Sequence, residues 1–271
     1  MRVYNTTTTT TRCSRVRYSR RAFRVTTRLY SACVACLAGS GAGGDGGVVV
    51  AGATGGVGQL VTAKLLEKGY AVRALVRDLD KAKMLFGPST SSDVSSDRLE
   101  IVCADARRAS EVDAAFNSTA GASVRGIIDC TGTTAFPSTR WLGGGGPSDT
   151  SIIVSNLVAA AVAASTVERY VFVSSIGVER RDTFPFSILN LFGALEHKAI
   201  GEAAVRDSGL KYCILRAARL TDGPYTRYGL QCTVNMREMT AVCVCVCVCV
   251  YVCVQYGEHL SLLRAAEIIR R

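Results

Sequence analysis

The sequence lacks any run of about 20 uninterrupted apolar residues, the length that a membrane-spanning helix needs. We therefore expect no membrane span. It also lacks acidic residues over its first 44 positions, where eight arginines lie. The net charge of +10 is concentrated in that stretch, and the remaining 227 residues carry only +2. A body so close to neutral argues against a nucleic-acid partner.

The first 45 residues are rich in arginine, serine and threonine and nearly free of acid. This composition is typical of an organellar transit peptide, and we expect residues 1–45 to be such a leader. A disordered leader with no targeting role is the alternative. Composition alone does not separate a plastid from a mitochondrial destination.

The twelve cysteines lack the arrangement of a disulfide framework. "CVAC" (33–36) has the CxxC spacing of metal sites, but no second pair follows at zinc-ribbon distance, so we expect no metal site. Cys103, Cys130 and Cys213 sit in apolar runs, where a cysteine usually acts as a small buried hydrophobe. A reducing compartment is the simpler reading of this distribution.

Short β-branched runs alternate with helical patterns from residue 46 to about 225, and no linker-like break interrupts them. This alternation predicts an α/β fold, a Rossmann-like doubly wound parallel sheet, in one domain over 46–228. The expected strands are 46–52, 71–76, 98–105, 125–132, 169–175 and 210–216.

"GATGGVG" (52–58) lies between the first predicted strand and the first predicted helix, the context in which a glycine-rich turn indicates dinucleotide binding. Glycine allows the tight turn, lets backbone approach a pyrophosphate, and lets the helix pack closely on the sheet. The helix N-terminus then offers N–H groups and a partial positive charge to phosphate. The expected cofactor-binding residues are Gly52, Thr54, Gly55, Gly56, Val57 and Gly58.

The residue after the second strand faces the adenosine ribose, and here it is Arg77, followed by Asp78. Arginine suits the 2′-phosphate of NADP(H), which we expect as the preferred cofactor, whereas Asp78 would suit NAD(H) if it faced the ribose instead. Asp105, after the third strand, is expected to accept from the adenine amino group. Thr131 and Gly132, after the fourth strand, are expected beside the ribose and nicotinamide.

Five ordered segments carry a family resemblance: "VAGATGGVGQLVTAKLLEKG", "RALVRDLDKA", "TGTTAFPSTRW", "ERYVFVSSIGV" and "GEAAVRDSGLKYCILRAARLTDGPYT". Over about 47–228 the chain resembles the atypical short-chain dehydrogenase/reductase proteins, above all the NmrA-like NAD(P)H-binding plastid proteins of plants and algae. The resemblance implies NAD(P)H as cofactor and a chloroplast location, with mitochondrion or cytoplasm as alternatives.

The same resemblance implies a catalytic serine, a tyrosine, and a lysine four positions after the tyrosine. Ser174 or Ser175 matches the serine, of which Ser174 is the candidate retained, and Lys198 matches the lysine. Ala194 stands where the tyrosine is expected, so the proton donor is missing. We therefore expect weak or no dehydrogenase turnover, with a non-catalytic redox sensor or assembly partner as the alternative. The small-molecule or protein partner stays unknown.

Residues 229–271 contain "AVCVCVCVCVYVCV" (241–254), where the resemblance would require a further strand and helix. Alternate cysteines on one strand have no turn to wrap a metal ion, and same-face neighbours lie at the edge of disulfide reach. A GT dinucleotide repeat translates as alternating valine and cysteine. Our hypothesis is that this tail derives from intron read-through or a mispredicted exon, which leaves the C-terminal part of the fold incomplete.

Overall fold

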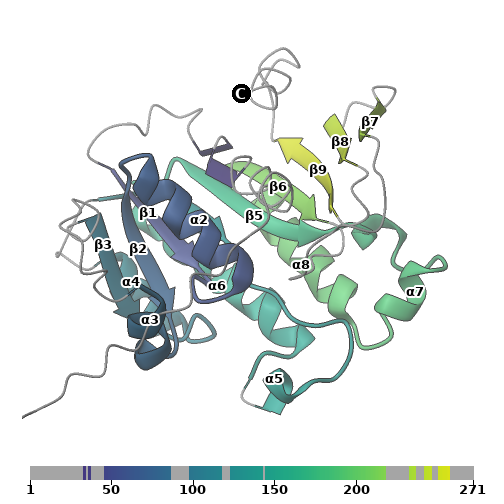
Figure 1. The fold of residues 1–271 in the computed structure, drawn as a ribbon, viewed down its shortest axis with the longest axis horizontal. Helices are drawn as coiled ribbons and strands as arrows, with labels where there is room; N and C mark the ends of the chain where they lie inside the picture. Colours follow the sequence, from purple (N-terminus) through teal and green to yellow (C-terminus); the bar gives the residue numbers. More distant parts are fainter. Residues whose placement is uncertain are drawn as a thin grey trace, which may run out of the picture.

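The structure is a computed structural model, and Figure 1 shows its ribbon. It describes residues 33–34, 36–37, 46–86, 98–117, 123–142 and 144–217, together with the backbone of three strands at 232–235, 241–245 and 250–256.

Six parallel strands form the body of the sheet in the order β3-β2-β1-β4-β5-β6. The central strands are almost fully buried, as expected of β-branched runs that are covered on both faces. The predicted Rossmann-like fold is confirmed. The bounds are β1 (Gly47–Ala51), β2 (Ala71–Val76), β3 (Leu99–Cys103), β4 (Val124–Asp129), β5 (Arg169–Ser175) and β6 (Lys211–Ala217).

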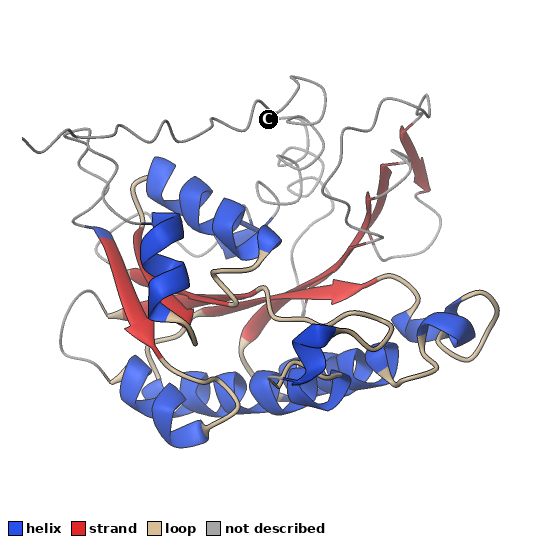
Figure 2. Cartoon of the chain, turned by 60° about the horizontal axis from the view of Figure 1, so that its bottom comes forward, coloured by secondary structure: helices blue, strands red, loops and turns tan. Residues whose placement is uncertain are grey.

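Helices cover both faces of this sheet (Figure 2). Apolar residues of α2 and α3 pack on one face, and those of α4, α6 and α8 pack on the other. Strand order reverses between β1 and β4, and a doubly wound fold binds its ligand at the carboxyl ends of the strands at this point. The helices are α2 (Gly56–Glu67), α3 (Leu79–Phe86), α4 (Ala109–Phe116), α5 (Thr139–Leu142), α6 (Pro147–Ala164), η2 (Val178–Arg180), α7 (Phe186–Leu189) and α8 (Ala194–Asp207).

Helix α6 is the one helix in the described ranges that is long and apolar enough to span a membrane by length and composition. It packs against α4 and α8, and Val154, Leu157 and Ala161 are completely buried in the core beneath the sheet. These residues give α6 a buried face in the domain core.

A short N-terminal segment, Cys33, Val34, Cys36 and Leu37, is buried on the α2 side of the sheet. Leu37 fits against Gly126 of β4, where any Cβ would lie 2.5 Å from Leu37 Cδ1. Arg169 of β5 donates from Nη1 to the Cys36 carbonyl at 2.5 Å. These residues lie inside the range predicted as a leader, yet they form part of the core. The apolar residues "CVACL" (33–37) interrupt the arginine-rich composition. Burying their apolar surface stabilises the packing of this segment on the sheet.

The tail from residue 229, which includes the Val-Cys repeat, contributes strands beyond the parallel body. β9 (Val250–Tyr256) pairs antiparallel with β6, β8 (Ala241–Cys245) with β9, and β7 (Cys232–Asn235) with β8. Alternation at period two suits extended backbone, whatever the origin of the sequence. The hypothesis of an aberrant tail therefore stays a prediction, and the side chains of the repeat lie outside the described residues.

Candidate functional site

The glycine-rich turn joins β1 to α2 through close backbone contacts. Gly52 adopts φ +71°, and a Cβ there would lie 3.0 Å from the Cys130 carbonyl oxygen. A Cβ at Gly58 would collide with the Gly52 carbonyl oxygen and lie 2.8 Å from the Ala53 Cα. Glycine at 52 is thus required by conformation, and glycine at 58 by the close approach of helix and strand.

The N-terminus of α2 leaves its first N–H groups available. Gly55 is the N-cap and makes no side-chain cap, and the first turn carries no acidic residue. Helix geometry gives the N–H groups of Gly56, Val57 and Gly58 no intrahelical acceptor. A Cβ at Gly56 would meet nothing within 4 Å, so this turn is open on one side. The turn therefore fits the pyrophosphate of a dinucleotide, since it combines free donors, the helix dipole and an open approach.

The rest of the turn is held in place from within. The Gly55 N–H donates to the Gly52 carbonyl at 2.9 Å, and the Gln59 side-chain amide donates to the Thr54 carbonyl at 3.0 Å. These bonds fix the turn's backbone before any ligand arrives, which reduces the ordering cost of binding.

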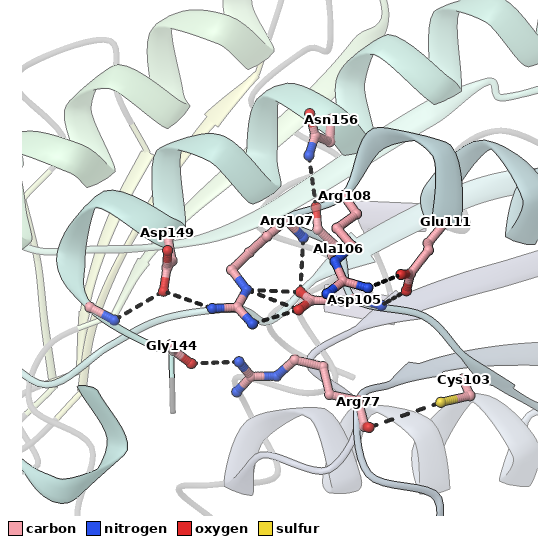
Figure 3. Close-up of polar contacts among 11 residues, drawn as sticks. Arg77, Cys103, Asp105, Ala106, Arg107, Arg108, Glu111, Gly144, Asp149 and Asn156 are labelled. Carbon is pink, nitrogen blue, oxygen red and sulfur yellow. Dashed lines mark hydrogen bonds and ion pairs between the residues drawn. The ribbon is translucent and has the colours of Figure 1, made fainter. Parts of the chain in front are cut away.

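Arg77 follows β2 and is exposed, and it reaches the loop between β4 and α6. Its Nη1 donates to the Gly144 carbonyl at 2.5 Å (Figure 3). The neighbouring Asp78 carboxylate accepts the backbone N–H of Lys81 at 2.9 Å and so holds the first turn of α3. Of the two residues that could read the adenosine ribose, the arginine therefore extends across the edge of the sheet, while the aspartate folds back onto its own helix.

Asp105 follows β3 and is paired with Arg107, a residue that the sequence analysis did not single out. Both carboxylate oxygens accept from the Arg107 guanidinium at 2.5–3.0 Å, and these hydrogen bonds are the main cause that lowers the pKa of Asp105. Figure 3 shows the guanidinium between Asp105 and Asp149, whose nearer oxygen lies 3.7 Å away. An adenine amino group would have to share the Asp105 carboxylate with this arginine.

Arg107 also lies against the β4–α6 loop. A Cβ at Gly144, which has φ +72°, would collide with the Arg107 guanidinium. Two arginines from different strand ends therefore converge on one glycine. The only sequence signals for this arrangement are the Asp-x-Arg spacing after β3 and the glycine run 143–146, and neither is specific.

The carboxyl end of β4 carries a buried polar cluster. Asp129 accepts from the Thr131 N–H at 2.8 Å, from the Thr131 hydroxyl at 2.6 Å and from the Tyr170 hydroxyl at 3.1 Å. Burial raises the pKa of Asp129, although these hydrogen bonds favour its charged form. The cluster fixes the backbone at Thr131, where the chain leaves the sheet.

Lys198 of α8 joins this end of the site. Its Nζ donates to the Thr131 carbonyl at 3.0 Å and to the Val173 carbonyl at 2.6 Å, and it lies 4.8 Å from the centre of the Phe172 ring. A Cβ at Gly132 would lie 3.5 Å from Nζ, so Gly132 leaves room beside the ammonium. Desolvation lowers the pKa of Lys198, with the Asp129 charge acting in the opposite direction.

The Ser174 side chain lies between the sheet and α8, and not at the strand ends. Its hydroxyl donates to Glu202 of α8 at 2.6 Å, and Arg216 of β6 forms a two-bond pair with the same carboxylate at 2.9 and 2.6 Å. All three side chains are nearly completely buried. Desolvation alone would raise the pKa of Glu202, but the hydrogen bonds from Arg216 and Ser174 outweigh it and lower the pKa. Ser175, the other candidate for the serine, is half-buried, and its hydroxyl donates to the Ile176 carbonyl at 3.3 Å.

Ala194 is the first residue of α8, one turn before Lys198, and is buried. By the family resemblance this is the position expected for the tyrosine, and the alanine methyl group carries no proton to donate.

Most of the residues predicted for the site follow the carboxyl ends of neighbouring strands, and Lys198 joins them from α8. The exception is Ser174, whose hydroxyl is engaged in the layer between the sheet and α8. The residues at the strand ends are Gly52, Thr54, Gly55, Gly56, Val57 and Gly58 after β1, Arg77 after β2, Asp105 after β3, and Thr131 and Gly132 after β4.

Comparison with known proteins finds relatives that are named as chloroplastic proteins. Chloroplastic protein TIC 62 of rice (Oryza sativa subsp. japonica) is 33% identical over 184 residues, which cover 62% of this chain and 34% of that protein. An uncharacterised chloroplastic protein of Arabidopsis thaliana is 34% identical over 187 residues, which cover 66% of this chain and 61% of that protein. The matched region thus spans about one third of the rice relative's length.

Among solved structures, the enzyme WbmG of Bordetella bronchiseptica in complex with NAD aligns with 68% of this chain and 56% of its own. The sequence identity is 17% and the TM-score is 0.48.

Residues 52–240 match the model of the NAD(P)H-binding family, which covers the glycine turn and the strand ends described above. The chain therefore belongs to the NAD(P)H-binding family.

Proposed function

We propose that this protein binds NADP(H) in preference to NAD(H) and turns over little or no substrate as a dehydrogenase. The observation that carries the proposal is the open N-terminus of α2, where the N–H groups of residues 56–58 have no intrahelical acceptor and Gly56 faces free space. The bound cofactor would supply hydride chemistry. The chain's own residues would hold it: Gly52, Thr54, Gly55, Gly56, Val57 and Gly58 at the pyrophosphate, Arg77 and Asp105 at the adenosine, and Thr131, Gly132 and Lys198 at the nicotinamide ribose.

The cofactor preference is supported by the two residues after β2. The Asp78 carboxylate is engaged by the Lys81 N–H, which makes it a poor partner for a ribose 2′-hydroxyl. Arg77 is exposed, and its described hydrogen bond goes to a neutral carbonyl. A 2′-phosphate would give this guanidinium a charged acceptor, and charge-assisted hydrogen bonds are the stronger ones.

The low turnover is supported by the other end of the site. Ala194 has no proton to give, and the Ser174 hydroxyl is engaged by Glu202. The candidate catalytic pair Ser174 and Lys198 thus has no obvious route for a proton to substrate. The second candidate function, a non-catalytic NADP(H)-dependent redox sensor or assembly partner, is favoured by this same observation.

Domain limits and location are part of the proposal. Residues 46–228 would be the dinucleotide-binding domain, with an aberrant tail from 229. The leader before it would keep its last part, which includes Cys36 and Leu37, packed on the sheet. A plastid location is supported by the printed names of the relatives, which are chloroplastic proteins.

Fluorescence titration of NADPH and NADH with the wild type and with Arg77→Glu tests the cofactor preference. We expect Arg77→Glu to weaken NADPH binding by about 10- to 100-fold, because a charge-assisted contact is replaced by repulsion, and to change NADH binding little. Arg125→Glu is a matched control, because Arg125 is 52% exposed and pairs with Glu168 near the amino ends of β4 and β5, away from the strand ends of the proposed site. Equal losses for both cofactors would refute the preference, and no binding of either would refute the proposed function.

Turnover is tested by following the absorbance of bound NADPH in the presence of quinones and small carbonyl compounds. Binding without consumption supports the non-catalytic alternative. Steady oxidation that Lys198→Met abolishes would instead establish a reductase.

A further inference from the structure

Two cysteines that are far apart in the sequence meet on the face of the sheet that α2 covers. Cys36 of the N-terminal segment and Cys213 of β6 are both buried, and their sulfur atoms lie 2.7 Å apart. The pair lies in the apolar core on the α2 side of the sheet. A disulfide bond has an S–S length of about 2.05 Å, so the two sulfurs need to approach by only about 0.7 Å.

The surroundings of Cys36 hold it at this position independently of the sulfur contact. The Arg169 guanidinium binds the Cys36 carbonyl, and Leu37 fits into the space that Gly126 leaves on β4. The segment is therefore held on β4 and β5 by backbone and side-chain contacts. These contacts position Cys36 next to Cys213 of β6.

A metal site does not explain the cluster. Within the residues that the structure describes, no group of three or more His, Cys, Asp or Glu side chains has an arrangement suited to a metal ion. Cys33, the other half of the CxxC spacing, is also buried, but the sulfur that Cys36 contacts belongs to Cys213. The close pair thus joins two distant parts of the chain and not the two ends of the motif.

We propose that Cys36 and Cys213 form a dithiol–disulfide site that exchanges with an external disulfide and covalently fastens the N-terminal segment to β6. The Cys36 thiolate attacks the external disulfide and releases one thiol, which leaves a mixed disulfide. The Cys213 thiolate then attacks the Cys36 sulfur and releases the second thiol. Two cysteine thiols are oxidised, and one external disulfide is reduced to two thiols.

Burial of the two cysteines slows the thiol–disulfide exchange. Desolvation raises the pKa of the Cys213 thiol, so the docked pair holds little of the thiolate that attacks a disulfide. Exchange therefore begins when the segment leaves the sheet and exposes Cys36, and redocking then brings the two sulfurs together. Once formed, the bond is shielded from solvent reductants until the segment opens again.

The test is disulfide mapping of the full chain. The protein is reduced with dithiothreitol, incubated with oxidised glutathione, alkylated in denaturant and digested, and the cross-linked peptides are identified by mass spectrometry. Mapping is needed because the chain has twelve cysteines, and a total thiol count would not identify the pair. We expect a Cys36–Cys213 cross-link. A Cys33–Cys36 cross-link, glutathione adducts alone, or no change at these positions would overturn the proposal.

Thermal unfolding gives a second readout with matched variants. The bond would close a loop over a sequence separation of 177 residues, so oxidation should raise Tm by roughly 5–15 °C. Cys213→Ala should abolish this rise, while Cys33→Ser, in the same segment, should keep it. A rise that persists in Cys213→Ala would refute the assignment. NADPH titration of the same samples separates this outcome from the proposed function, which does not depend on the cysteine pair.

Discussion

The two ends of the proposed cofactor site differ in where their polar groups are directed. At the β1–β2 end, the N–H groups of α2 are open and the exposed Arg77 extends across the edge of the sheet. At the β4–β5 end, Lys198 donates to two main-chain carbonyls and Ser174 donates to a buried carboxylate. The polar groups of the first end are open to a ligand, whereas those of the second are engaged by the protein itself. We therefore expect mutations to separate dinucleotide binding from the stability of the fold.

Among the variants that test this comparison, Glu202→Gln should cause the largest loss of stability. The substitution leaves the Arg216 charge buried without its full partner, which should lower the free energy of unfolding by about 3–5 kcal/mol. NADPH affinity should change little, because the cluster supports the fold and not the ligand. Urea denaturation and NADPH titration of the same variant check both points, and a large loss of affinity in a still-folded protein would contradict the separation.

The same variant carries a pH signature. Because the pKa of Glu202 is lowered in the folded state, its stabilisation is complete above the ordinary glutamate value of about 4.3 and is lost as the pH falls through the lowered value. Stability of Glu202→Gln should therefore fall less on acidification than that of the wild type. Glu179→Gln is the matched control, because Glu179 contacts the same Arg216 from a side chain that is 69% exposed.

Gly58→Ala, in contrast, should lower both stability and NADPH affinity. The new methyl group collides with the Gly52 carbonyl and pushes the α2 N-terminus away from β1, at a cost of about 1–3 kcal/mol in stability. NADPH binding should fall by at least about 10-fold, because the N–H groups lose their alignment toward the phosphates. Gly56→Ala is the control for packing. Its Cβ would meet no protein atom, so Tm should stay unchanged, and any loss of NADPH affinity would come from contact with the ligand. Normal NADPH affinity in Gly58→Ala would place the cofactor elsewhere.

Lys198→Met should change stability less than Glu202→Gln or Gly58→Ala does. Because the pKa of Lys198 is lowered in the folded state, the wild type gains stability as the pH rises from that lowered value toward the ordinary lysine value of about 10.4. Methionine removes this gain, so the pH profile of stability flattens in the alkaline range while NADPH affinity falls about 10-fold or less. An unchanged alkaline profile would show that the ammonium is better solvated than its carbonyl contacts indicate.

The fold was predictable because its signals are local. The β-branched runs, the glycine turn and the helix stops give all six parallel strands within about three residues of their observed limits. The prediction that Cys103 is buried was wrong: its side chain is exposed. Cys103 ends β3, the edge strand of the sheet, where an apolar sequence run does not ensure that both faces are covered by helices.

The contacts within the site were less predictable because they join residues that no short pattern links. Arg77 reaches Gly144 over a separation of 67 residues, and Glu202 engages Ser174 from a different element. Sequence motifs indicated which strand ends would carry polar groups, but not which of those groups would be satisfied internally.

The close fit of Leu37 over Gly126 makes one residue of β4 an indicator for a whole segment. Any side chain at position 126 would occupy the volume that the leucine fills. In relatives, glycine at this position is therefore expected to accompany an apolar segment upstream of the first strand, and a larger residue to accompany its absence. A single column of an alignment can thus be used to sort relatives by the architecture of their N-terminal region.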